Sequence, residues 1–518
     1  MNTIDLSNQL TLADVVAVAN GRAQVQLGPV GRARVQRARD VVDNFLTQHD
    51  VPRYGINTGF GALAEVVIPI EQVQALQTNL IRSHATGVGR DLPKEIVRAI
   101  ALLRAQVLAC GHSGVRPIVI DTLCQMLHAG VHPRIPAQGS VGASGDLAPL
   151  AHLALVLIGE GEAEFHGELL PGLVALQRAQ IKPLQLQAKE GLSLINGTQV
   201  MTAIGALALD RADRVLRAAD IAGAMTVEAQ LGTTAAFDER IVALRPYPGA
   251  IAVAQNLRQL CENSQLMASH VDCHKVQDPY SLRCMPQVHG AVRDALDFVR
   301  QTLTIEIAAV TDNPLIFADD SKSDAASAVI LSGGNFHGQP VAIACDLARL
   351  ALTSLMSMSE RRIEQLVNPH LNSGLPAFLA RNSGLNSGFM IAQVTAAALV
   401  SESKGLCMPA SIDSIPSSAN REDHVSMGPI AARRFTDVVD HAEYVVGIEL
   451  LCAAQGIDQR APVLPGIGTL AAWQSIRSVV AVLEEDRILQ PDILAAAELV
   501  RSGKLIVAVE KRLGHPLR

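Results

Sequence analysis

A proline-free stretch at residues 341–367 constrains the fold of this chain more than any other feature. Apolar side chains recur along it at helical intervals, at Leu347, Leu350, Leu355, Met358 and Leu366. This spacing predicts a long helix near the centre of the molecule, because the apolar stripe of a helix has to be buried. The sequence also predicts a second long helix at about residues 432–454.

The composition favours a fold dominated by helices. Hydrophobic residues make up 49% of the 518 residues but aromatic residues only 3%, so the core consists mainly of Ala, Leu, Val and Ile. Such side chains suit closely packed helices. Helical spacing also recurs at residues 94–110, 117–130 and 200–218, and alternating residues around 163–169 predict a short hairpin. We therefore expect a mainly α protein with few strands.

No linker divides the chain, since proline and glycine are spread along it rather than clustered. The expected organisation is a loop-rich N-terminal lobe at residues 1–200, a central long-helix bundle at 201–460 and a C-terminal helical cap at 461–518.

Charge and cysteine usage exclude several classes of partner. The net charge is −7 at pH 7 with both signs spread along the chain, which argues against binding to nucleic acid or an anionic membrane. The eight cysteines include no Cys-x-x-Cys pair, and residues 1–30 lack a signal-peptide pattern, so we expect a cytoplasmic protein. His270 and His274 flank Cys273, but no glutamate follows His270, and no metal site is predicted.

The tripeptide Ala143-Ser144-Gly145 points to unusual chemistry. If the Gly145 nitrogen closes onto the Ala143 carbonyl and Ser144 loses its hydroxyl as water, the product is a methylidene-imidazolone ring with an electron-poor methylene. Two simpler interpretations stay open for this glycine-rich run: a phosphate-binding nest, and capping of a helix N-terminus by Ser144 and Asp146.

Six segments in order along the chain give this tripeptide a context. They are Tyr-Gly-Ile-Asn-Thr-Gly-Phe-Gly at 54–61, Gly-Ala-Ser-Gly-Asp-Leu-Ala-Pro-Leu at 142–150, Leu-Ile-Asn-Gly-Thr-Gln at 194–199, Gln-Asp-Pro-Tyr-Ser-Leu-Arg at 277–283, Gly-Asn-Phe-His at 334–337 and Glu-Asp-His-Val-Ser-Met at 422–427. Together they resemble the motifs of the histidine and aromatic amino-acid ammonia-lyases. The resemblance covers most of the chain.

The resemblance implies a long central helical bundle of the fumarase/aspartase-like superfamily, with the cofactor carried by the N-terminal lobe. It also implies that residues 143–145 form 4-methylidene-imidazol-5-one (MIO) without an external cofactor. This group would capture the substrate amine and make it a better leaving group. The implied enzyme is a homotetramer whose small-molecule substrate is an amino acid, with active sites shared between chains.

The same resemblance assigns the catalytic residues. Tyr54 would take the β-proton, although a tyrosine with the ordinary pKa of about 10 is a poor base unless its phenolate is stabilised. Asn196 would polarise the ring carbonyl, and Tyr280 and Glu422 complete the catalytic set. Each also has a structural interpretation: an aromatic plug over a glycine turn for Tyr54, a turn residue for Asn196 and a capping acid for Glu422.

A second set is predicted to bind substrate: Ser83, His84, Gln277, Arg283, Phe336 and Met390. Arg283 offers a planar fork for the substrate carboxylate, or else forms a surface ion pair. Phe336 either belongs to the core or lies over the reacting centre. The pair Ser83-His84 resembles the histidine lyases. It also fits an imidazole substrate chemically, because the His84 side chain would be left unpaired against a bare phenyl ring. Glu422 agrees, since a carboxylate accepts an imidazole N–H.

Departures from the family pattern leave alternatives open. Arg421 stands where glutamine is usual, and Gly338-Gln339 where Ala-Glu is common, both near the specificity positions. We therefore expect elimination of ammonia from L-histidine to give urocanate, with a tyrosine or phenylalanine lyase or an aromatic 2,3-aminomutase as alternatives. A fumarase or aspartase type of lyase is disfavoured, because Gln287-Val288-His289 replaces the lysine and asparagine of its serine loop. A non-enzymatic helical scaffold protein is a further alternative. It would lack the near-ultraviolet absorption that the methylidene-imidazolone ring should add.

Overall fold

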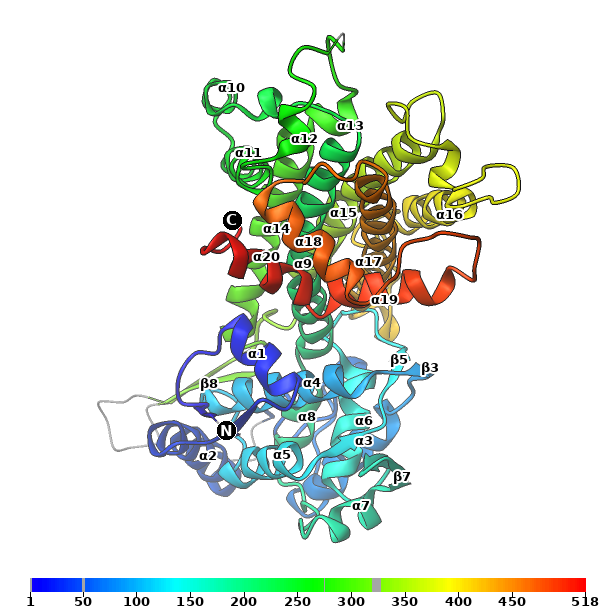
Figure 1. Cartoon of the computed structure of the whole chain (residues 1–518). Helices are drawn as coiled ribbons and strands as arrows, with labels where there is room; N and C mark the ends of the chain where they lie inside the picture. The colour runs from blue at the N-terminus through cyan, green and yellow to red at the C-terminus, as the bar shows by residue number, and fades with distance from the viewer. Residues whose placement is uncertain (1, 49–51, 274, 319–327) are drawn as a thin grey trace. The chain divides into compact units, whose positions relative to one another are not determined.

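The computed structural model describes residues 2–48, 52–273, 275–318 and 328–518 (Figure 1). Its contacts group the chain into two compact units. The first, called here the N-terminal unit, comprises Met1–Leu207, Gln301–Asp346 and Pro409–Arg433, and the second, called the helical unit, comprises Ala208–Arg300, Leu347–Met408 and Arg434–Arg518. This grouping differs from the expected three-part division, because two internal segments return to the N-terminal unit and residues 461–518 join the helical unit.

The N-terminal unit combines short helices with small sheets. Its helices are α1 (Leu12–Ala19), α2 (Pro29–Gln48), α3 (Val73–His84), α4 (Lys94–Ala109), α5 (Pro117–Ala129), α6 (Leu147–Leu157), α7 (Gly172–Arg178) and α8 (Glu190–Ile195). Its strand pairings are β1 (Asn2–Asp5) with β2 (Ala23–Gln26), β3 (Val88–Asp91) with β5 (Pro136–Gln138), β4 (Val131–Pro133) with β6 (Glu162–Phe165), β6 with β7 (Glu168–Pro171), and β8 (Leu315–Phe317) with β9 (Val329–Leu331). Antiparallel pairing of β6 with β7 confirms the hairpin predicted around residues 163–169.

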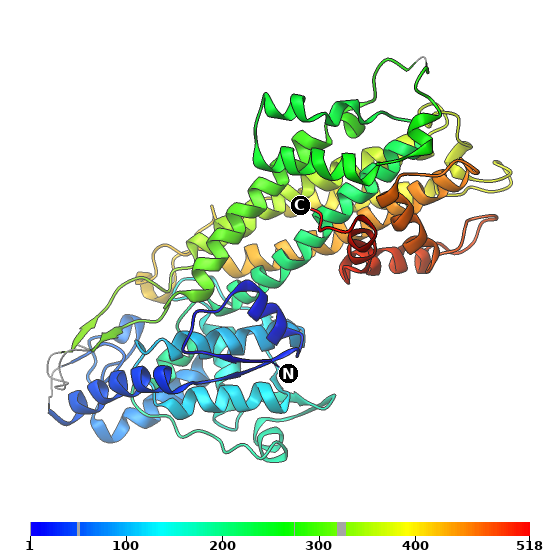
Figure 2. The same cartoon turned by 60° about the vertical axis from the view of Figure 1, so that its left-hand side comes forward.

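Four long helices each have one end in the N-terminal unit and continue in the helical unit: α9 (Gln199–Ala229), α14 (Met285–Ala308), α15 (Gln339–Val367) and α17 (Gly428–Asp458). Helices α15 and α17 confirm the two long helices predicted from the apolar spacing. Within the helical unit the four helices lie side by side (Figure 2). Among the described residues α15 alone is long and apolar enough to span a membrane, but 67% of its apolar stretch is buried in the protein, as expected for a core helix.

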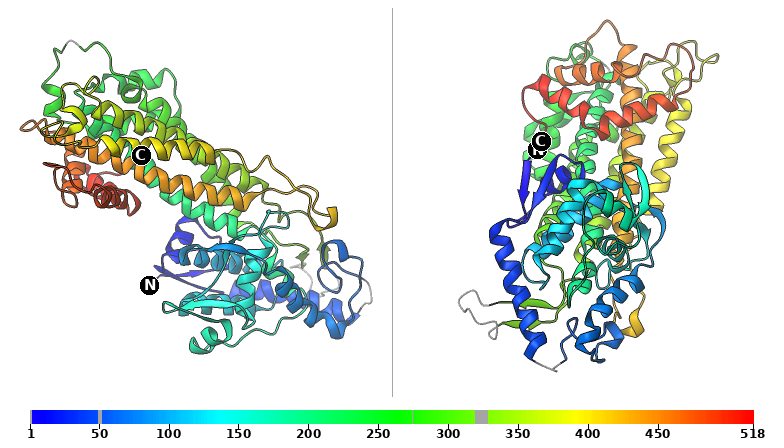
Figure 3. Two further views of the ribbon diagram at one scale, coloured as in Figure 1. Left: turned by 90° about the vertical axis from the view of Figure 1, so that its right-hand side faces the viewer. Right: turned by 90° about the horizontal axis from the view of Figure 1, so that it is seen from below.

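The helical unit is completed by shorter helices. They are α10 (Glu239–Ala243), α11 (Pro248–Leu260), α12 (Gln265–Ala268), α13 (Tyr280–Arg283), α16 (Met390–Leu406), α18 (Ile467–Arg477), α19 (Gln490–Arg501) and α20 (Lys504–Leu513). The C-terminal helices cover one side of this unit (Figure 3). Helix α19 packs so closely on α17 that a Cβ added at Gly447 would lie 2.9 Å from the Ala497 nitrogen.

A buried polar network connects the four long helices within the helical unit. Arg362 of α15 donates from Nε and Nη2 to the two carboxylate oxygens of Glu449 of α17, at 2.5 and 2.8 Å. Thr226 of α9 also donates to Glu449, at 2.9 Å. Arg362 Nη1 lies 3.2 Å from Nε2 of His289 of α14. Because each member has partners, the network fixes how these helices pack.

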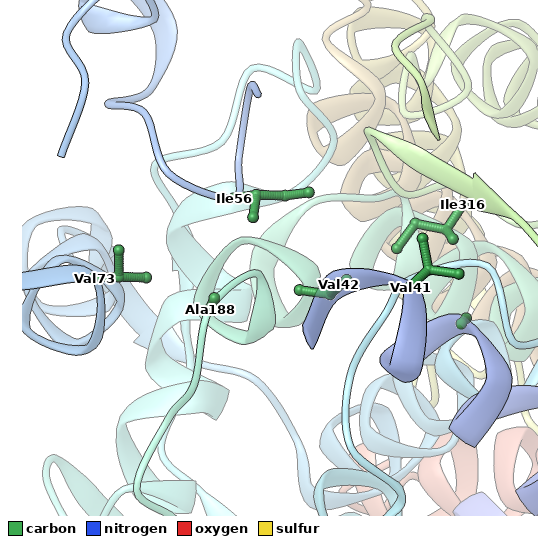
Figure 4. Close-up of a cluster of buried hydrophobic side chains, with 7 residues drawn as sticks. Val41, Val42, Ile56, Val73, Ala188 and Ile316 are labelled. Carbon is green, nitrogen blue, oxygen red and sulfur yellow. The ribbon is translucent and has the colours of Figure 1, made fainter. Parts of the chain in front are cut away.

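A hydrophobic cluster in the N-terminal unit supports the loop that follows residue 53. It contains Ala38, Val41, Val42, Ile56, Val73, Ala188 and Ile316 (Figure 4). Burial of Ile56 anchors this loop on α2 and on the start of α3. The cluster therefore holds Tyr54, two residues earlier in the chain.

Candidate active site

The N-terminal unit contains a pocket of about 780 Å³. Its lining includes residues from five of the six motif segments, and loops or helix ends present most of them. The predicted site residues among them are Tyr54, His84, Ala143, Ser144, Asn196, Phe336 and Glu422. The fold thus brings together segments that are almost 370 positions apart in the sequence.

Glycine is required at the tripeptide by a close approach of two backbones. Gly145 has φ +75°, and a Cβ added there would lie 2.1 Å from the Gly197 carbonyl oxygen. The Asp146 N–H donates to that same oxygen at 2.7 Å. Only glycine combines a positive φ with this contact at no steric cost. The segment is therefore held in a tight bend against residues 196–197.

Two side chains hold Ser144 from either side. Asn196 Nδ2 donates to the Ser144 carbonyl oxygen at 2.7 Å, and Ser144 Oγ donates to Glu422 Oε1 at 2.7 Å. If Gly145 closes onto Ala143, the Ser144 carbonyl becomes the ring carbonyl, and the hydroxyl held by Glu422 is the one to be lost. The residues present therefore fit the expected ring.

Asp146 caps a helix, but not the helix that it precedes. It stands at the N-cap of α6 without a capping hydrogen bond from its side chain. Its Oδ2 instead accepts the N–H groups of Val200 and Met201 at the start of α9, at 2.8 and 2.9 Å. Burial raises the pKa of Asp146 to about 7, against the opposing effect of these hydrogen bonds. Asp146 is therefore a capping residue, but the helix that it caps is α9, and the cap links the tripeptide to that helix.

Tyr54 is half-buried in the pocket, with Phe60 edge-on at 6.4 Å between ring centroids. Burial raises the pKa of Tyr54 above its ordinary value, and the nearby negative charge of Glu422 adds to the effect. A hydrogen bond from the Gly61 N–H opposes the shift. The phenol is therefore protonated at neutral pH within this unit, and a base role needs further positive charge or donors.

His84 is the last residue of α3 and lines the pocket. Its Nδ1 lies 2.8 Å from the Leu80 carbonyl oxygen. Because a carbonyl only accepts, Nδ1 carries the proton and Nε2 of the neutral ring is an acceptor. Ser83 Oγ donates to the same Leu80 oxygen at 3.0 Å, and Ser83 is absent from the pocket lining.

Another part of the lining carries a charged side chain and two stacked rings. His337 and His424 stack with centroids 5.8 Å apart and an interplanar angle of 3°, joining the segment before α15 to the segment before α17. Phe336, beside His337, lines the pocket and is half-buried. Arg421 is the only lysine or arginine among the described residues that line the pocket, and it is exposed.

The four remaining predicted residues, Gln277, Tyr280, Arg283 and Met390, belong to the helical unit and are absent from the pocket lining. The Tyr280 side chain is exposed, and the Arg283 guanidinium lies 4.7 Å from its ring centroid. Gln277 is exposed in the loop before α13, and Met390 begins α16. Their roles stay predictions.

His270, one of the two histidines that could mimic metal ligands, has other partners. His270 Nδ1 lies 2.6 Å from the Leu266 carbonyl oxygen, and its Nε2 lies 2.8 Å from that of Gly232. His274 lies outside the described residues. Within the part of the chain that the structure describes, no group of three or more His, Cys, Asp or Glu residues could hold a metal.

Sequence reasoning missed several residues around the tripeptide. Ser417 Oγ donates to Glu422 Oε2 at 2.6 Å and fixes that carboxylate from behind. Arg104 donates to the Asn196 carbonyl oxygen at 2.9 Å. One signal was available for Arg104, because it and Gln106 are the only polar residues in the buried part of α4 at residues 99–109.

Comparisons with known proteins agree with this geometry. The family model for aromatic amino acid lyases matches residues 10–478. Histidine ammonia-lyase from Sorangium cellulosum (strain So ce56) is 57% identical over 511 residues, covering 98% of this chain and 99% of the relative. Among solved structures, histidine ammonia-lyase from Trypanosoma cruzi has a TM-score of 0.91 and 42% identity over 99% of this chain and 96% of its own. Tyrosine aminomutase from Streptomyces globisporus has a TM-score of 0.93 and 38% identity, with 100% of both chains covered.

Proposed function

The chain belongs to the aromatic amino acid lyase family, and we propose that it is a carbon–nitrogen lyase that eliminates ammonia from L-histidine to give urocanate, trans-3-(imidazol-4-yl)acrylate. The observation that carries the proposal is the placement of Ser144 between Asn196 and Glu422, in a pocket that also contains His84. The near full-length similarity to proteins named histidine ammonia-lyase supports histidine as the substrate.

The cofactor is proposed to be MIO, made from Ala143, Ser144 and Gly145 with no external component. When formed, it supplies the electrophile that converts the substrate amine into a better leaving group. The chain's contribution is to hold the ring carbonyl: Asn196 Nδ2 already donates to the Ser144 oxygen at 2.7 Å. Gly145, with its positive φ, allows the bend that brings the reacting backbone atoms together.

Tyr54 is the proposed acceptor of the β-proton. Because burial and Glu422 raise the pKa of Tyr54, its phenolate needs stabilisation beyond the Gly61 N–H. We infer that Tyr280 and Arg283 complete the site when substrate is bound. The Arg283 guanidinium would take the substrate carboxylate by two parallel hydrogen bonds.

Recognition of the imidazole is assigned to His84 and Glu422. The Nε2 of neutral His84 accepts a hydrogen bond and therefore suits an imidazole N–H. A phenyl ring offers no such donor, and leaving this half-buried acceptor unpaired would cost up to about 1–3 kcal/mol. The negative charge of Glu422 suits the same ring, either as an acceptor or by proton exchange.

We propose that the active enzyme is a homotetramer, with the residues of the helical unit supplied by a second copy of the chain. The proposal is supported by the pocket lining, which contains none of Gln277, Tyr280, Arg283 and Met390, and by the exposure of the Tyr280 side chain. Cysteines that are all free favour a reducing compartment, and we place the enzyme in the cytoplasm.

Co-expression of two inactive variants tests the shared site. Tyr54→Phe and Arg283→Met chains are expected to restore about a quarter of wild-type activity together, because a quarter of randomly assembled sites would combine an intact Tyr54 with an intact Arg283 from another chain. Light scattering should report a tetramer. Activity no higher than that of either variant alone, or a fully active monomer, would contradict the shared site.

The substrate is tested by a ranking assay. Purified protein with L-histidine should release ammonia and an absorbing unsaturated acid, faster than with L-tyrosine or L-phenylalanine. His84→Leu should reverse the preference, lowering kcat/KM for histidine by about 10- to 100-fold, as expected for an unpaired imidazole. A wild-type preference for tyrosine would overturn the use of His84 and Glu422. A β-amino acid product would favour the aminomutase alternative.

A further inference from the structure

Arg104 lies directly behind the residues that hold the tripeptide. It belongs to α4 and is 0% exposed. Its Nη1 donates to the carbonyl oxygens of Ser193 and Asn196, at 2.5 and 2.9 Å. These oxygens lie at the C-terminal end of α8, where carbonyl groups lack partners within the helix. The guanidinium thus fixes the backbone of the residue whose side chain holds Ser144.

The charge of Arg104 is buried with too few hydrogen-bond acceptors around it. Its Nε and Nη2 have no hydrogen-bond partner among the described residues. Burial lowers the pKa of Arg104 to about 10, whereas the negative charges of Asp312 and Asp146 act in the opposite direction. A buried cation with incomplete hydrogen bonding destabilises a fold. Stability alone therefore does not explain an arginine at this position of an apolar helix.

A stack of close contacts connects the guanidinium to the tripeptide. A Cβ added at Gly197 would lie 2.4 Å from Arg104 Nη2, so the guanidinium presses against the Gly197 backbone. On its other side, the Gly197 oxygen accepts the Asp146 N–H at 2.7 Å and lies where a Cβ of Gly145 would be. Asn196 Nδ2 contacts the Ser144 oxygen next to this bend. The order is Arg104, then residues 196–197, then residues 144–146.

We propose that Arg104 is a positioning residue for the cyclisation of Ala143-Ser144-Gly145. The proposal rests on the proposed MIO cofactor. By holding residues 196–197 forward, Arg104 keeps the bend compressed and keeps the Asn196 amide on the Ser144 carbonyl.

The reaction that Arg104 supports is balanced within the chain. The Gly145 nitrogen bonds to the Ala143 carbonyl carbon. The Ala143 oxygen leaves as water with the protons of the Gly145 and Ser144 nitrogens. A second water takes the Ser144 hydroxyl and the Ser144 Cα proton. No oxidant or external reagent is needed, and the product is lighter than the translated chain by two waters.

Intact mass and near-ultraviolet absorption of purified variants test the proposal without measuring turnover. We expect Arg104→Met to fold, by circular dichroism and cooperative melting, with the cyclised fraction reduced about tenfold or more. Arg98→Met is the matched control on the same helix. Arg98 donates to the Val18 and Leu127 carbonyl oxygens, at 2.9 and 3.0 Å, away from the tripeptide. This control should be destabilised yet fully cyclised.

The conservative variant keeps the test decisive if Arg104→Met does not fold. Arg104→Lys retains the charge and one donor, and it should lose the two waters about tenfold more slowly than wild type, followed by mass over time. Folded Arg104→Met that is as fully cyclised as wild type, or Arg104→Lys that cyclises at the wild-type rate, would overturn the role of Arg104 alone. Wild type at full translated mass would overturn the cofactor as well.

Discussion

Arg362 in the helical unit and Arg104 in the N-terminal unit are both fully buried, but their surroundings differ. Arg362 shares two hydrogen bonds with the carboxylate of Glu449 and also contacts His289. Arg104 donates hydrogen bonds only to carbonyl oxygens, and two of its nitrogens have no hydrogen-bond partner among the described residues. Arg362 therefore belongs to a hydrogen-bonded charge network, whereas Arg104 has no ionised hydrogen-bond partner in the part of the chain that the structure describes.

The difference indicates that the buried charge in the helical unit serves stability, whereas the buried charge beside the pocket serves the chemistry. A buried charge network with satisfied hydrogen bonds fixes one packing of long helices and resists change. Around the pocket, positive φ values at Gly142, Gly145 and Gly197 accompany the unsatisfied Arg104. A buried charge with unpaired donors is costly, and it is expected where a site needs a defined, compressed geometry. The N-terminal unit thus contains a region whose geometry serves the reaction rather than stability.

The largest effect should come from Ser144→Ala, which should abolish activity while leaving the stability of the fold almost unchanged. Without the hydroxyl no methylidene can form, and we expect activity to fall by about three orders of magnitude or more. The unfolding free energy should change by only about 1 kcal/mol, because the cyclised wild type has itself lost the hydroxyl that donates to Glu422 before cyclisation. Steady-state assays and urea unfolding measure the two quantities. Activity near the wild-type level would refute the role of Ser144.

Arg362→Met should produce the opposite pattern. It leaves Glu449 buried and uncompensated, which costs about 3–5 kcal/mol of unfolding free energy. The folded fraction should still carry the cyclised mass. Arg381→Met is the control, because the side chains of Arg381 and its ion-pair partner Glu484 are 55% and 54% exposed, and such a surface pair contributes about 0–1 kcal/mol. Equal losses in the two variants would remove the distinction between a satisfied network and a surface pair.

Asp146→Asn should give a smaller, pH-dependent effect. The pKa of Asp146 is raised from 3.8 to about 7 in the folded protein, so between these values the folded state binds more protons than the unfolded state. Its contribution to unfolding free energy therefore decreases as pH rises through this window. Urea unfolding at several pH values should show the variant gaining stability relative to wild type as pH rises. A pH-independent difference would mean that Asp146 is not buried as a titrating acid.

The smallest effect is expected from Arg421→Gln at the exposed side of the pocket. Its charge should attract the substrate carboxylate over a distance, so KM for histidine should rise about two- to fivefold at low salt, with kcat unchanged. The difference should shrink at high ionic strength. A fall in kcat would instead place Arg421 in contact with the reacting groups.

Local patterns predicted much of the fold. Apolar spacing located α15 and α17, because a long helix is specified by its own periodicity. The motif segments placed Ser144, Asn196 and Glu422 in one pocket. The sequence division missed that residues 301–346 and 409–433 return to the N-terminal unit, because no local signal records which distant segments pack together.

Other contacts depended on long-range geometry. Asp146 caps α9, which begins 53 positions later, rather than the helix beside it. Arg104 acts on a carbonyl 92 positions away. Propensity identifies a capping residue or a buried charge, but tertiary packing selects its partner.

The intact mass of active wild-type enzyme, with fragmentation of the peptide that contains residues 143–145, tests the account most directly. We expect the whole protein to be lighter than its translated sequence by two waters, with the loss confined to Ala143, Ser144 and Gly145. A preparation that turns over histidine while these residues keep their full translated mass would contradict it.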